Sequence, residues 1–149
     1  MKNKDVLELA SAGFADITAY TLGSAEAFRV FRLRKAIHAV WRKLFLVEMD
    51  MQRECGIEDS RRFDAELMKL RQAGDSEELT QMEGRLLRYL GMRNAMYEEP
   101  CELPAITPLG YDDWRKLQAE NKESKALSGE NEMLLEGVLW VAPQEEEKT

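Results

Sequence analysis

The chain has 149 residues, of which 44% are hydrophobic and 33% charged, a composition typical of a globular domain and not of a disordered one. The net charge of −7 argues against a general binder of polyanions, because the summed field repels phosphate. No apolar run approaches the roughly 20 residues that span a bilayer, so we expect a cytoplasmic protein without membrane contact. Its two cysteines, Cys55 and Cys101, are expected to be reduced thiols.

A short helix is predicted over residues 6–12, followed by an irregular link from Gly13 to Gly23. The β-branched and aromatic residues within this link permit a strand, so residues 14–22 could be strand or loop. The choice between the two stays open at this stage.

The strongest pattern predicts one long helix, from about 24 to 55. Ser24 is a suitable N-cap, Gly56 a suitable terminating residue, and neither Pro nor Gly interrupts residues 25–55. Apolar residues recur at alternating spacings of three and four, as in a helix that packs lengthwise on another helix in the manner of a coiled coil. This seam comprises Val30, Leu33, Ile37, Val40, Leu44, Val47 and Met51. A second apolar set lies off the seam and comprises Phe31, Trp41, Phe45 and Met49.

The length of this helix bears on the architecture. Thirty-two residues span about 48 Å at ~1.5 Å each. A compact sphere of this chain length has a diameter of roughly 38 Å. We therefore predict either an elongated helical bundle around this central helix or a fold completed by another copy or another protein.

Two further helices are predicted, the first over residues 60–73 with an apolar face and a stop at Gly74. Asp75 is predicted to cap the second, with Glu78 completing a capping box. One face of this second helix is apolar, and the opposite face carries Gly84 and Gly91. Glycines cost a helix about 1 kcal/mol each, so these two indicate either close approach by a neighbouring backbone or a weak helix.

Composition changes at Glu98. Three prolines within residues 99–108 predict an extended strap. Thr107 is predicted to cap a short helix that starts at Pro108 and runs to about 121, and Ser128 to cap a last helix that ends near Trp140. We expect residues 1–141 to form a single helical domain and residues 142–149 to form a disordered acidic tail.

The sequence contains no motif typical of a catalytic site, a metal site or a cofactor site. His38, the single histidine, lies within the long helix with no nucleophile at motif spacing, and is read as a surface residue. A di-iron site needs two Glu-x-x-His motifs, which one histidine cannot supply. The carboxylate pair Glu120 and Glu123 has no companion set for magnesium. We therefore predict no enzymatic activity, no metal and no cofactor.

A basic strip covers residues 29–43, which hold six cations and no acid: Arg29, Arg32, Arg34, Lys35, Arg42 and Lys43. Arg32, Lys35 and Arg42 share one helical face and are spaced to reach phosphates. Three readings stay open, namely binding to nucleic acid, charge pairing with acidic segments of this chain or a partner, and no role.

The order of segments resembles a known group. The long helix ends in Arg53-Glu54-Cys55-Gly56-Ile57 and is followed by a Phe63-x-x-Glu66-Leu67 helix. A Pro-containing strap, a Tyr111-Asp112-Asp113-Trp114 helix and a short apolar helix at 132–140 come later. This order is similar to small bacteriophage and prophage helical proteins of unknown function found among virion and packaging genes. The resemblance implies a part in assembly or interaction and supplies no catalytic residues.

The leading hypothesis is a non-enzymatic interaction or assembly protein that self-associates through its long helices, as a homo-oligomer or with another phage protein. The alternative is a nucleic-acid-binding accessory protein that uses the basic strip. Candidate interaction residues are Arg29, Arg32, Lys35, Arg42, Trp41, Phe45, Gly84 and Gly91.

Overall fold

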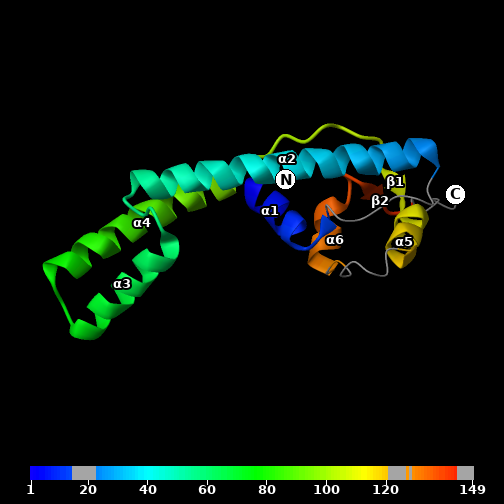
Figure 1. Ribbon diagram of the computed structural model, residues 1–149. Helices are drawn as coiled ribbons and strands as arrows, with labels where there is room; N and C mark the ends of the chain where they lie inside the picture. Colours follow the sequence, from blue (N-terminus) through cyan, green and yellow to red (C-terminus); the bar gives the residue numbers. More distant parts are fainter. Residues whose placement is uncertain (15–22, 121–126, 128, 144–149) are drawn as a thin grey trace, which may run out of the picture. The chain divides into compact units, whose positions relative to one another are not determined.

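The computed structural model describes residues 1–14, 23–120, 127 and 129–143, and within these the protein is mainly helical (Figure 1). In chain order the elements are α1 (Asn3–Ser11), α2 (Ser24–Glu54), α3 (Ser60–Ala73), α4 (Glu77–Glu98), β1 (Leu109–Gly110), α5 (Tyr111–Glu120), α6 (Gly129–Leu135) and β2 (Trp140–Val141). The predicted helical class and the predicted long helix are confirmed, since α2 has 31 residues. The elongated outline stays a prediction.

The chain divides into two compact units. Unit 1 comprises Met1–Arg42 and Pro100–Thr149, and unit 2 comprises Lys43–Glu99. The first part of α2 thus belongs to unit 1 and its last part to unit 2. The single domain predicted over 1–141 stays a prediction.

In unit 1, the strap is tied to the start of the chain. The backbone N–H of Cys101 donates to the carbonyl of Met1 at 2.8 Å, and Lys2 and Pro100 form an antiparallel bridge. The carboxylate of Asp5 accepts from the N–H of Lys2 at 2.8 Å and so caps α1. Residues 101–108 form neither helix nor strand, which confirms the non-helical strap predicted from the prolines.

The helix that follows the strap, α5, begins at Tyr111 and thus later than predicted. Leu109 and Gly110 form β1, which pairs in parallel with Trp140 and Val141 of β2. The N–H of Leu109 donates to the carbonyl of Leu139 at 2.6 Å, and this bond holds the chain extended. The helix predicted from Pro108 is therefore wrong in its start, because a pairing with a distant segment overrides the local N-terminal signal of the proline.

The last helix is shorter than predicted. α6 ends at Leu135, and Gly137 has a φ of +77°, a conformation that favours glycine. The helix predicted to reach Trp140 is wrong, because the chain turns at this glycine and continues into β2. Its predicted cap, Ser128, lies outside the described residues, as do residues 15–22 of the predicted strand or loop and residues 144–149 of the tail.

Unit 1 is built around side chains with no exposed surface, and these come from segments far apart in the sequence. Trp114 of α5 is the largest of them. Val30, Leu33 and Ile37 of the predicted seam are fully buried and belong to the same cluster. The other buried members are Val6, Leu9, Phe14, Leu109, Leu117, Leu127, Leu135, Leu139 and Trp140.

In unit 2, α2 ends at Glu54, close to the predicted end at about 55, and the chain turns at Gly56 as predicted. This residue has a φ of +75°, and its N–H donates to the carbonyl of Arg53 at 3.0 Å. The N–H of Ile57 donates to the carbonyl of Gln52 at 2.8 Å. Together the two bonds form a Schellman motif, which satisfies carbonyls at the end of the helix.

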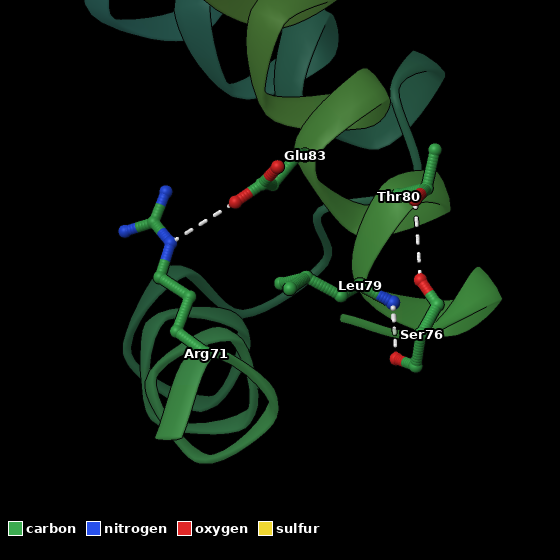
Figure 2. Close-up of polar contacts among 5 residues, drawn as sticks. All are labelled: Arg71, Ser76, Leu79, Thr80 and Glu83. Atoms are coloured by element: carbon green, nitrogen blue, oxygen red, sulfur yellow. Dashed lines mark hydrogen bonds and ion pairs between the residues drawn. The ribbon is translucent and has the colours of Figure 1, made fainter. Parts of the chain in front are cut away.

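The caps of α3 and α4 are local. Asp59 caps α3 by accepting from the N–H groups of Arg61 and Arg62, at 3.0 and 3.2 Å. Ser76 caps α4, since its hydroxyl accepts from the N–H of Leu79 at 3.1 Å (Figure 2). The capping box predicted for Asp75 and Glu78 is therefore wrong by one residue, because the serine places its oxygen on the third amide of the helix instead.

The core of unit 2 is smaller and consists of Cys55, Ile57, Phe63, Leu67, Leu79 and Tyr89. The predicted inward faces of α3 and α4 are confirmed, because Leu70, Met82, Leu86 and Leu90 pack against this cluster. α3 and α4 are joined by Gly74, with a φ of +97°, and by an ion pair between Arg71 and Glu83 (Figure 2).

Candidate interaction surface on α2

Large apolar side chains gather on the exposed surface of α2. Among the residues that the structure describes, ten large hydrophobic side chains are exposed, and six of the ten belong to this one helix. They are Phe28 (62% exposed), Phe31 (50%), Trp41 (37%), Phe45 (52%), Leu46 (60%) and Met49 (36%). Phe28, Phe31 and Trp41 belong to unit 1, and Phe45, Leu46 and Met49 belong to unit 2. Neighbouring exposed apolar groups are typical of binding surfaces.

The two apolar sets predicted for α2 have different environments. Val30, Leu33, Ile37 and Leu44 of the seam are buried. All four residues of the off-seam set, including the predicted interaction residues Trp41 and Phe45, are exposed. The sequence pattern separated these sets correctly but missed Phe28 and Leu46, which are among the most exposed members.

The basic strip lies mostly on the same exposed surface. Arg32, Lys35 and Arg42 are exposed, and within the described part of the chain none of the three has a carboxylate at ion-pair distance. Lys35 places its ammonium over the ring of Phe31, 5.6 Å from the centroid. Such a cation–π contact contributes about 0.5–1 kcal/mol at an exposed site.

Arg29 is engaged differently from the rest of the strip. It is half-buried, and its Nη1 donates to the carbonyl of Thr107 at 3.3 Å. This bond fastens the strap to α2 inside unit 1. Arg29 therefore has a structural role within the unit, whereas the exposed cations are directed to solvent.

His38 is exposed and lies beside Trp41, with the ring centroids 5.9 Å apart. The predicted reading of His38 as a surface residue agrees with this position. His38 and Trp41 therefore add two neighbouring aromatic rings to the exposed side of α2.

Gly84 and Gly91, the two glycines predicted to contact a neighbour, are exposed on α4. Among the described residues and apart from the backbone of α4 itself, no heavy atom lies within 4 Å of a side-chain carbon built on either glycine. Contact with another molecule stays a prediction.

A polar cluster links α2 to α4 in unit 2, and it was not predicted. The hydroxyl of Tyr89 donates to the carboxylate of Glu48, and Gln52 Nε2 donates to the same hydroxyl at 3.3 Å. The guanidinium of Arg93 lies 5.8 Å from the ring centroid of Tyr89 and 5.4 Å from that of Tyr97. The spacing of Tyr89, Arg93 and Tyr97 at intervals of four was the signal that could have found it.

The environment of this cluster raises the pKa of two tyrosines, Tyr89 and Tyr97. Burial raises the pKa of Tyr89 above its ordinary value, and the hydrogen bond to Glu48 raises it further. Burial also raises the pKa of Tyr97, with the nearby charge of Glu48 as the next cause. Both phenols are therefore neutral hydrogen-bonding groups in the folded protein, and neither is poised to act as a base.

Among the described residues, no group of three His, Cys, Asp or Glu side chains is arranged to hold a metal ion. Neither Cys55, which is buried, nor Cys101, which is half-buried, takes part in a disulfide among the described residues, and their reduced state stays a prediction. The thiol of Cys55 contacts the sulfur of Met92 at 3.7 Å and belongs to the core of unit 2.

No described helix combines the length and apolar character required to cross a membrane.

No protein-family model, curated protein or solved structure matches this chain.

Proposed function

We propose that this protein is a non-enzymatic interaction protein that associates with a second copy of itself through the exposed surface of α2. The observation that supports the proposal is the concentration of exposed apolar side chains on one helix, six among the ten on described residues. Covering a large apolar side chain stabilises an association by roughly 1.5–3 kcal/mol when burial is complete. Aromatic residues and methionine are also enriched at protein interfaces.

The proposal includes an assembly role in a bacteriophage or prophage, as the order of segments suggested. It also keeps the protein in the cytoplasm, where the free thiols of Cys55 and Cys101 stay reduced.

Two matched substitutions test self-association. Leu46→Asp places a charge on α2, and Met68→Asp does the same on α3, at side chains of nearly equal exposure (60% and 63%). In light scattering on a sizing column, we expect the wild type and Met68→Asp to elute as the same oligomer. We expect Leu46→Asp to dissociate, because association would bury an unpaired carboxylate. A wild-type protein that stays monomeric at all concentrations contradicts the proposal.

A second candidate function is nucleic-acid binding. Arg32, Lys35 and Arg42 favour it, because all three are exposed and none pairs with a described carboxylate. Three phosphate contacts would give an affinity that falls steeply as salt rises. The net charge of −7 opposes it.

The two functions differ in what elutes with the protein. Nucleic-acid binding predicts co-elution that is lost at high salt and in the triple variant Arg32→Glu, Lys35→Glu, Arg42→Glu. Self-association predicts a discrete oligomer free of nucleic acid. Absorbance at nucleic-acid and protein wavelengths, recorded together with light scattering, distinguishes them.

A further inference from the structure

We propose that the basic and aromatic surface at the start of α2 docks on α6 of a second copy of this chain. The α2 surface consists of Phe28, Phe31, Arg32 and Lys35. The α6 surface consists of Glu130 and Met133 in the helix and Glu136, the residue that follows its last turn. This inference deepens the proposed self-association by naming the surface that a second copy presents. Both surfaces belong to unit 1.

The α2 surface requires an occupant that is both apolar and acidic. Phe28 and Phe31 are 62% and 50% exposed and provide the apolar part. Arg32 and Lys35 provide the cations, and residues 29–43 contain no acid that could neutralise them locally. An apolar partner alone would leave two cations desolvated without counter-charges, which is costly.

The α6 surface has the complementary composition. Met133 is 70% exposed, more than any apolar side chain of α2. Glu130 and Glu136 are exposed as well. Glu130 lies three residues before Met133 in α6, and Glu136, just after the helix, donates its N–H to the carbonyl of Met133 at 3.2 Å. The third carboxylate of this segment, Glu132, is occupied by a hydrogen bond from Gln118 Nε2. One apolar anchor between two carboxylates thus faces solvent.

Other occupants fit the α2 surface less well. Pairing of this surface with itself would bring Arg32 and Lys35 of two copies together, and like charges in contact weaken association. Nucleic acid would stack bases on the phenyl rings, but the ammonium of Lys35 already lies over the ring of Phe31. An acidic surface of a second copy satisfies the cations and the rings together.

Reciprocal charge reversal tests the pairing. One full-length variant carries Arg32→Glu and Lys35→Glu on the α2 surface, and the other carries Glu130→Lys and Glu136→Lys on the α6 surface. Each variant alone would oppose charges of the same sign, so we expect the dissociation constant to rise at least about tenfold. The equimolar mixture restores opposite charges at every contact, so we expect association close to that of the wild type. Sedimentation velocity over a concentration series measures all of these quantities.

The control is a variant with the same change of charge elsewhere, Arg61→Glu with Lys69→Glu on α3, whose side chains are also exposed. It is expected to associate as the wild type does, and circular dichroism checks that every variant is folded. Restoration in the mixture supports the pairing even if one variant is less stable than the wild type.

The outcomes separate this inference from the proposed function. If both reversed variants associate normally while Leu46→Asp dissociates, docking on α6 is overturned and self-association through α2 is retained. Loss of association in both variants without recovery on mixing also overturns the docking. A wild type that is monomeric, or that associates only with nucleic acid, overturns both.

Discussion

The two units differ in how their cores are assembled. Unit 2 is a continuous stretch, Lys43–Glu99, and its core residues keep a small exposed fraction. Unit 1 combines Met1–Arg42 with Pro100–Thr149, and eleven of its large side chains are less than 2% exposed. A continuous helical unit is specified largely by local signals, whereas a discontinuous unit depends on contacts that close long loops.

The largest expected effect is in unit 1. Trp114→Ala removes the largest fully buried side chain and is expected to lower the free energy of unfolding by about 3–5 kcal/mol, because a cavity is left. Urea unfolding followed by circular dichroism measures the change. Trp114→Phe is the matched control. Its loss is expected to be smaller, since the indole N–H has no acceptor among the described residues.

The same variant tests the independence of the two units. Hydrogen exchange in Trp114→Ala is expected to accelerate in α1, α5 and α6 and to change little in α3 and α4. Equal acceleration in both sets would show that the units unfold together, and the contrast between them would then fail.

The next largest loss of stability is expected from removing the N-cap of α4 in unit 2. Ser76→Ala removes the hydroxyl that accepts from the N–H of Leu79, and such a cap contributes about 0.5–2 kcal/mol. Asp75→Ala, one residue earlier, is expected to change stability much less. Thermal unfolding of the two variants measures the difference. A larger loss for Asp75→Ala would show that the cap is the aspartate in solution.

The sequence predicted unit 2 well because its signals are local. The stop of α2 at Gly56, the start of α3 at Ser60 and its end at Gly74 are all set by residues within one helical turn. The inward faces of α3 and α4 followed from the helical period. The cap of α4 was misplaced by one residue because Asp75 and Ser76 are both good capping residues, and composition alone does not choose between neighbours.

Unit 1 was predicted less well because distant segments compete with local propensity. Pro108 favours the first turn of a helix, yet the bond from Leu109 to Leu139 makes the next residues a strand. Leu139 lies thirty residues after Leu109, and no local sequence pattern predicts this pairing. The burial of Trp114 has the same origin, because the cluster that contains it includes residues of α1, α2 and α6 that lie far from α5 in the sequence.

The candidate surface was predicted in part. The off-seam position of Trp41, Phe45 and Met49 followed from spacing alone, and the structure finds all three exposed. The acidic and apolar surface of α6 was missed, because residues 132–140 were predicted only as a short apolar helix, whereas Met133 is 70% exposed. Seven residues provide too short a helix for its period to show which side faces the core.

The polar cluster of unit 2 predicts a dependence on alkaline pH. The pKa of Tyr89 is raised in the folded state, so the neutral phenol is favoured there. This contribution is present below the ordinary tyrosine value of about 10 and is lost as the pH rises through the folded value. The free energy of unfolding is therefore expected to fall at strongly alkaline pH.

Tyr89→Phe isolates this contribution. At neutral pH the variant is expected to lose about 0.5–1.5 kcal/mol, because the bonds to Glu48 and Gln52 are removed. Its stability is also expected to fall less between neutral and alkaline pH than that of the wild type. Parallel profiles for the two proteins would assign the alkaline loss to other groups.

The smallest effect concerns the ion pair between α3 and α4. Arg71 Nε lies 3.2 Å from Glu83 Oε1, and both side chains are about half exposed (Figure 2). A double-mutant cycle with Arg71→Ala and Glu83→Ala is expected to give a coupling energy of about 0.2–1 kcal/mol, reduced at high salt because water and ions screen the charges. The pair between Arg62 and Glu66, which lies within α3 alone, is the reference. If unit 2 is held by local caps and its small core, the two coupling energies should be similar. A coupling several times larger for Arg71 and Glu83 would mean that contacts between helices stabilise unit 2 as they do unit 1.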